Sequence, residues 1–162
     1  MVSSVRAARY EEVAALLRLI ERAIEHACRS HYDRAQRRAV YLGYATNLFV
    51  DAVGPFETVV IDRGGQCAAV AQLDVARGGL RALFVDAPFQ RQGLGQTLLA
   101  AVEDRARAAG CAELAGAMSL NAVPFYTRAG FIPHSGPERL LTAGIRVPVV
   151  RMRKPLRSIP IN

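Results

Sequence analysis

An abrupt passage from a strand into a helix with two glycines at its start most constrains how this chain folds. The segment DAPFQRQGLGQTLLAAVEDRARAAG runs from Asp86 to Gly110, directly after the apolar stretch LRALFV. The first turn of a helix leaves backbone N–H groups without partners, and the helix dipole adds partial positive charge there. Gly93 and Gly95 remove side chains that would block close approach. The pattern therefore predicts an anion-binding site at the start of this helix.

Two common phosphate-binding loops do not fit the segment. An ATPase loop ends in GK[ST], whereas the chain has Gly95-Gln96-Thr97 at the matching positions. The dinucleotide fingerprint requires a third glycine where the chain has Leu98. It also requires βαβ units, whereas two predicted helices precede a hairpin here. These residues argue against both an ATPase and a dinucleotide-binding protein.

The whole chain, residues 1–162, is predicted to form one α/β domain whose mixed, mostly antiparallel sheet is flanked by helices. Apolar spacing and turn residues give the order β-α-α-β-β-β-α-β-α-β-β. The predicted strands are Ser3–Ala8, Glu57–Asp62, Gln66–Val75, Leu80–Asp86, Cys111–Met118, Phe131–His134 and Ile145–Met152. The predicted helices are Tyr10–Cys28, Asp33–Gly43, Gly93–Ala109 and Ala122–Gly130.

Charge narrows the class of partner. The formal net charge is +7, almost all of it from arginine. A basic domain attracts nucleic acid, acidic membrane or a phosphorylated cofactor, although arginine also serves simply to keep a protein soluble. The arginines are scattered along the chain rather than clustered, so we expect no DNA-binding surface.

The remaining composition indicates a cytoplasmic protein. No apolar run approaches the ~18 residues of a membrane span, and the N-terminus lacks the order of a signal peptide. Cys28, Cys67 and Cys111 are widely spaced without a CxxC pair. They predict neither a disulfide framework nor a metal site, and they are expected to pack as small apolar residues.

Two motifs resemble those of the GNAT superfamily of N-acetyltransferases. Gln90-Arg91-Gln92-Gly93-Leu94-Gly95 resembles its cofactor loop, Q/R-x-x-G-x-G/A, and follows the strand residues Leu83-Phe84-Val85. The later segment SLNAVPFYTRAGF resembles a second family motif through Asn121, Tyr126 and Gly130-Phe131. The resemblance extends from Val5 to about Met152, and only the region between Cys28 and Phe56 is unspecific.

The resemblance implies acetyl-CoA as co-substrate. The backbone of Leu83, Phe84 and Val85 would pair with the pantetheine arm, whereas their side chains also suit a core. Asn121 would hydrogen-bond the same arm, and its alternative role is to cap the following helix. The diphosphate would lie on the cofactor loop, on the residues Gln90, Arg91, Gln92, Gly93, Leu94, Gly95 and Gln96, with Thr97 near it.

The resemblance also implies that Tyr126 is the general acid. An amine would attack the thioester directly, and the phenol would protonate the leaving thiolate. The alternative is that Tyr126 only packs against the sheet, as its neighbour Phe125 does.

The expected general base is where the sequence departs from the family. Many relatives carry a glutamate on the strand before the loop, where this chain has Arg81 in LRALFV. Other candidates are Asp74, Glu113, His26 and His31, or the amine arrives already neutral and needs no base. Arg81 would meet an acidic acceptor or form an internal ion pair.

The acceptor site is less defined. In the family the first helices and the loop between them form a wall of the acceptor site, which corresponds here to His26–Gln36. His31 and Tyr32 would then either contact a small amine or merely cap the second helix. The apolar segment Tyr41–Phe56 would form a wall of this site or a homodimer contact.

The leading hypothesis is acetyl transfer from acetyl-CoA to a primary amine of a small molecule or peptide. The alternatives are a catalytically silent acyl-CoA-binding module and an acetyltransferase for an amine carried on RNA. The choice between acetyl and a longer acyl group stays open.

Overall fold

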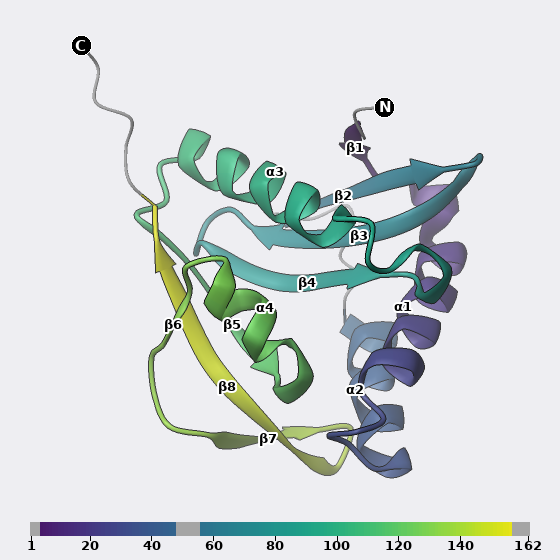
Figure 1. Ribbon diagram of the computed structural model, residues 1–162, viewed down its shortest axis with the longest axis vertical. Coiled ribbons are helices and arrows are strands. Elements are labelled where there is room, and N and C mark those ends of the chain that lie inside the picture. The colour runs from purple at the N-terminus through teal and green to yellow at the C-terminus, as the bar shows by residue number, and fades with distance from the viewer. Residues whose placement is uncertain (1–3, 48–55, 157–162) are drawn as a thin grey trace.

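The computed structural model describes residues 4–47 and 56–156. Its helices lie on both faces of a sheet of eight strands (Figure 1). The strands are β1 (Val5–Ala7), β2 (Phe56–Arg63), β3 (Gln66–Asp74), β4 (Gly79–Val85), β5 (Glu113–Ser119), β6 (Ile132–Pro133), β7 (Glu138–Thr142) and β8 (Ile145–Pro155). The helices are α1 (Val13–Ala27), α2 (Arg34–Asn47), α3 (Leu94–Ala108) and α4 (Val123–Arg128), with 3-10 turns η1 (Tyr10–Glu12), η2 (Ala87–Phe89) and η3 (Leu120–Ala122).

The sheet is mixed and mostly antiparallel, which confirms the predicted fold class. Its strand order is β1-β2-β3-β4-β5-β8-β6, and β7 pairs with β8. Every pairing is antiparallel except that of β4 with β5. This parallel pairing consists of a single register pair, Gly79 with Ala115.

Strands β4 and β5 meet closely at one end and separate toward the other. At the closed end the Ala115 N–H donates to the Gly78 carbonyl over 2.9 Å. A Cβ on Gly116 would lie 2.7 Å from the Leu80 carbonyl oxygen, so only glycine permits this approach. Beyond this point no β4 residue pairs with β5, and Figure 1 shows the two strands diverging. The sheet therefore opens beside the second half of β4.

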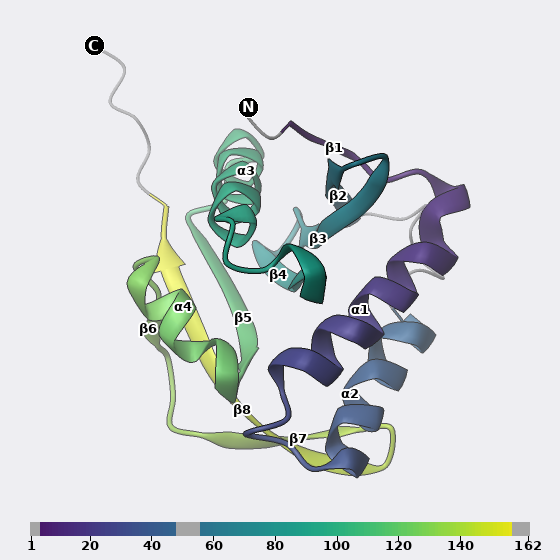
Figure 2. The ribbon, with the colours of Figure 1, turned by 45° about the vertical axis from the view of Figure 1, so that its right-hand side comes forward.

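Each face of the sheet has its own apolar cluster. Helix α3 buries Leu94, Leu98 and Val102 on one face. Helix α1 buries a stripe with helical spacing, including Leu16 and Ile20, against the other face. Helix α2 packs beside α1 and touches β7 and β8 (Figure 2). The opening between β4 and β5 is consequently flanked by α3 and its preceding loop on one side and by α1 and α2 on the other.

The structure corrects the sequence prediction in two places. Strand β7 was not predicted, because its turn to β8 uses Ala143 with a φ of 46° beside Gly144 with a φ of 78°. Alanine seldom adopts such a conformation and is not a hairpin signal. Helix α2 continues past Gly43 to Asn47; residues 48–55 of the predicted apolar wall lie outside the described part of the chain. Among the described residues no helix is long and apolar enough to cross a bilayer.

Candidate active site

Two cavities meet at the opening between β4 and β5. The loop-side cavity, of about 570 Å³, is lined by Ala23, Ala27, Cys28, Leu83, Phe84, Val85, Phe89, Gln90, Arg91, Gly93, Leu94, Gly95, Gln96, Ser119, Asn121, Ala122, Phe125, Tyr126 and Arg128. The α2-side cavity, of about 520 Å³, is lined by Ile24, Cys28, Tyr32, Val40, Gly43, Tyr44, Leu80, Arg81, Ala82, Leu83, Phe84, Ala117, Met118, Ser119, Ala122, Tyr126, Leu140, Thr142, Val147 and Val149. Six residues line both cavities and form their junction: Cys28, Leu83, Phe84, Ser119, Ala122 and Tyr126.

The start of α3 presents backbone donors to the loop-side cavity. Arg91 and Gly93 have φ values of 62° and 76°, which turn the chain sharply into the helix. The first bond of the helix joins the Thr97 N–H to the Gly93 carbonyl over 3.1 Å. The N–H groups of Leu94, Gly95 and Gln96 therefore have no backbone acceptor in the described structure. Their arrangement suits an anion.

An ion pair fixes the loop to α1. Asp86 is buried at the end of β4 and accepts three hydrogen bonds from Arg22, one of 3.0 Å at Oδ1 and two of 2.8 and 3.3 Å at Oδ2. The same carboxylate accepts the Ala87 N–H over 2.9 Å. The Gln90 side chain donates to the Val85 carbonyl over 3.1 Å. Sequence reasoning missed Arg22, because nothing in the local pattern indicates a partner 64 residues away.

Most of the residues predicted for the cofactor line the loop-side cavity. Gln92 and Thr97 do not, and the Thr97 hydroxyl donates to the Gly93 carbonyl over 3.1 Å. Asn121 lies at the cavity and accepts the Cys28 Sγ–H over 3.3 Å. It does not cap α4, whose N-cap position is Ala122 without a side-chain bond. Burial raises the pKa of Cys28 to about 11, so this residue remains a thiol at neutral pH.

Tyr126 lies at the junction of the cavities. The residue is 5% exposed, and its ring packs edge-on against Phe125 and Phe131, at centroid distances of 5.1 and 5.2 Å. Its hydroxyl makes no hydrogen bond with any residue in the described part of the chain. Burial, and to a lesser degree the nearby Tyr44, hold the pKa of Tyr126 well above its usual value. The phenol is therefore protonated throughout the neutral pH range.

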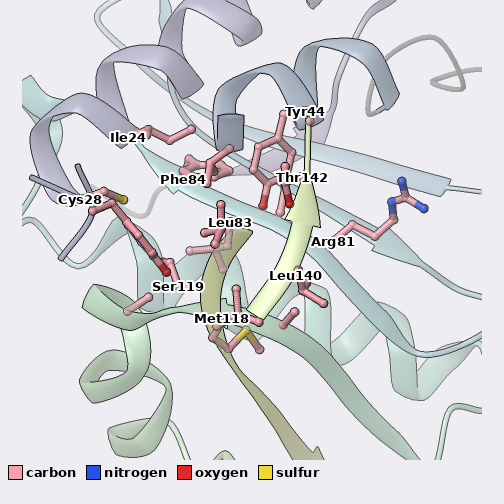
Figure 3. Close-up of a pocket in the computed structure, with 18 of the residues that line it drawn as sticks. Ile24, Cys28, Tyr44, Arg81, Leu83, Phe84, Met118, Ser119, Leu140 and Thr142 are labelled. Atoms are coloured by element: carbon pink, nitrogen blue, oxygen red, sulfur yellow. The ribbon is translucent and has the colours of Figure 1, made fainter. Parts of the chain in front are cut away.

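The α2-side cavity is mainly apolar, with hydroxyl groups and one cation. Tyr44 packs edge-on against Phe84 at 5.1 Å, and burial raises the pKa of Tyr44 to about 12. Figure 3 shows Arg81 extending at one end of this cavity, while Cys28 and Ser119 lie at the other. Tyr44 belongs to the apolar segment Tyr41–Phe56 that was predicted as a wall of the acceptor site or a dimer contact, and it lines this cavity. Sequence reasoning missed Thr142, which lies on the strand that was not predicted.

The residues considered as a base are elsewhere. Asp74 accepts backbone N–H groups of its own turn, and Glu113 lies 3.9 Å from Arg153. His26 and His31 are exposed. Within the described residues no Asp, Glu or His lines either cavity. The same residues contain no cluster of three or more His, Cys, Asp or Glu side chains that could hold a metal ion.

The two predicted acceptor contacts near α1 differ in their placement. His31 lines neither cavity, and its Nδ1 lies 3.0 Å from the Ser30 hydroxyl. Tyr32 is buried and lines the α2-side cavity. Its hydroxyl donates to the Pro148 carbonyl over 2.6 Å and accepts the Leu120 N–H over 2.9 Å. Tyr32 thus joins the segment between α1 and α2 to β8 and η3, and both bonds occupy its hydroxyl.

The sequence and the fold both resemble those of known acetyltransferases. The family model of an acetyltransferase (GNAT) domain matches residues 45–156. The chain resembles a GCN5-related N-acetyltransferase structure from Rhodopseudomonas palustris with a TM-score of 0.87 and 22% identity, over 96% of this chain and 99% of that one. It also resembles the PaiA N-acetyltransferase from Thermoplasma acidophilum, which was solved in complex with coenzyme A. Here the TM-score is 0.74 and the identity 16%, over 96% of this chain and 99% of that one.

The ribosomal-protein-S18-alanine N-acetyltransferase from Escherichia coli gives a TM-score of 0.69 and 21% identity, over 99% of this chain and 98% of that one. The curated protein sequences contain no match. The family match covers well over half of the chain and agrees with both motifs, so the protein belongs to the GNAT family of acetyltransferases.

Proposed function

We propose that the protein is an N-acetyltransferase that moves the acetyl group of acetyl-CoA to a primary amine of a small molecule or peptide. One observation carries this proposal: Tyr126, whose hydroxyl has no partner among the described residues, lies where the loop-side and α2-side cavities meet. A thioester that entered from the first cavity would meet an amine from the second beside this phenol.

The loop-side cavity fits a CoA molecule. The free N–H groups at the start of α3 would bind the diphosphate, and Arg91 and Arg128 add positive charge at the rim. Because N–H groups alternate between the two edges of a strand, the Asp86 N–H bonded to Ala68 of β3 leaves the Val85 N–H facing the opening. This free edge of β4 would pair with the amides of the pantetheine arm. The relative solved with coenzyme A supports the assignment.

Tyr126 would supply the proton for the leaving group. The neutral amine attacks the thioester carbonyl, the C–S bond breaks, and Tyr126 protonates the thiolate. The new amide nitrogen then loses a proton, and this proton restores the phenol of Tyr126. The overall reaction therefore releases no proton. Desolvation raises the pKa of Tyr126, but it also destabilises a thiolate formed beside it, so the transfer remains favourable.

The proposal includes no general base. No carboxylate or imidazole of the described residues lines either cavity, and a mainly apolar cavity disfavours an ammonium ion. The amine would therefore enter in its neutral form. A silent CoA-binding module would not require a phenol without a partner at the junction. We also place the enzyme in the cytoplasm, since its cysteines are unpaired, as in reducing compartments.

The phosphate site can be tested by Gly93→Glu. The new carboxylate would lie beside the diphosphate and should weaken acetyl-CoA binding at least about a hundredfold, because like charges repel. Gly93→Ala is the matched control, since a Cβ there meets nothing within 4 Å and both variants adopt the same left-handed backbone. Calorimetric titration should show near-normal binding for Gly93→Ala. Equal affinities for the two variants would contradict the assignment.

Tyr126→Phe should lower kcat by about 10²–10⁴ and leave acetyl-CoA affinity unchanged. The ring contacts with Phe125 and Phe131 persist in this variant, so thermal unfolding should stay close to that of the wild type. Steady-state kinetics with an accepted amine measure the effect. An unchanged kcat would remove Tyr126 from the chemistry.

The pH profile tests the absence of a base. Tyr126 must be protonated, and its raised pKa keeps it so across the neutral range. Activity should therefore rise with pH only as the acceptor loses its proton, about tenfold per unit below the pKa of the amine. The apparent pKa of kcat/KM should move from about 8 to about 10 between an α-amino and an alkylamine acceptor. A constant apparent pKa near 6–7 for both amines would instead indicate an enzymic base.

A further inference from the structure

We propose that the acceptor carries an anionic group, such as a carboxylate, which Arg81 binds at the end of the α2-side cavity away from Tyr126. An apolar body would separate this group from the reacting amine. The inference rests on the proposed function and names the class of acceptor.

An irregularity in the sheet determines the position of Arg81. In the pairing of β3 with β4, Gln72 lies opposite Ala82 and Leu73 lies opposite Leu80, so Arg81 is an extra residue. Such bulges redirect a side chain. Ala82 belongs to the apolar cluster beneath α1 and α2, and Arg81 stacks on Phe56, which shares the β2 face of Val60 in that cluster. Two consecutive residues therefore face the α2 side, and Arg81 lines one end of the acceptor cavity (Figure 3).

Arg81 has no anionic partner in the described part of the chain. Its guanidinium carbon lies 4.0 Å from the centroid of the Phe56 ring. Its Nε is buried without a hydrogen-bond acceptor. Stacking occupies one face of the guanidinium and leaves its N–H edge unused. A planar edge of donors at the end of a cavity suits a carboxylate.

The rest of the cavity determines the body of the acceptor. Among the described lining residues, Arg81 is the only charged one, so a second cationic group on the acceptor would be repelled. The wall is apolar and includes Phe84, Met118 and Leu140. Arg81 and Phe84 are three residues apart on β4, a distance of about 10 Å. The anionic group and the amine must therefore be separated by several carbon atoms.

A set of six-carbon acceptors of similar length tests this class: 6-aminohexanoate, hexylamine and 1,6-diaminohexane. The wild type should acetylate 6-aminohexanoate with a kcat/KM about tenfold or more above that of hexylamine, as expected for one charge-assisted hydrogen bond. The diamine should be the poorest. Arg81→Met should remove the preference through KM, with hexylamine little changed. Arg77→Met, which removes the same charge in the exposed turn before β4, should behave as the wild type.

Binding provides a readout that does not depend on turnover. In NMR titrations, hexanoate should bind the CoA-loaded wild type and CoA-loaded Arg77→Met with equal affinity. Its affinity for Arg81→Met should be lower by about tenfold or more. If hexylamine and 6-aminohexanoate react equally, or Arg81→Met slows both equally, the inference is overturned while the acetyltransferase stands. If no amine reacts yet hexanoate binds through Arg81, the proposed function fails and the ligand class stands. Hexanoate binding that is absent or independent of Arg81 also overturns the inference.

Discussion

The parallel pairing of β4 with β5 stops after one register pair, Gly79 with Ala115, and the position of the site depends on this. Close contact at Gly116 holds the strands together at one end, and their divergence leaves half of β4 with an unpaired edge. Unpaired backbone groups inside a sheet need partners. In the proposed function the amides of the pantetheine arm would supply such partners, so the opening in the sheet suits this ligand.

The charges around this opening divide the site into three zones. Free N–H groups at the start of α3 favour an anion at one end. At the junction, burial keeps both Tyr126 and the Cys28 thiol uncharged. Arg81 adds a single cation at the far end. In the proposed reaction a polyanionic donor and the anionic group of the acceptor would bind on opposite sides of an uncharged centre, where a neutral amine would attack the thioester without a base.

Local sequence motifs predicted the loop before α3 and singled out Tyr126. The arrangement of the acceptor side depends instead on contacts between residues that are distant in sequence. The glycine spacing of QRQGLG predicts a helix start open to a ligand, and the structure has one. The role of Tyr32 could not be predicted in this way, because the hydrogen-bond partners of its hydroxyl are 88 and 116 residues away in the sequence. The face of the sheet on which Arg81 lies depends on a one-residue register change between β3 and β4. The position of Thr142 in the cavity wall depends on the turn after it, where Ala143 has a positive φ. Neither has a local sequence signal.

The central claim is that acetyl-CoA lies along the free edge of β4 and on the start of α3. Amide hydrogen exchange followed by NMR, with and without acetyl-CoA, tests it most directly. The account predicts that the amides of Val85 and Gly95 exchange more slowly when acetyl-CoA is bound, since both would acquire acceptors. The Ala115 amide, already bonded to Gly78, should change little. Protection confined to α2 and β7, with Val85 and Gly95 unaffected, would contradict the account.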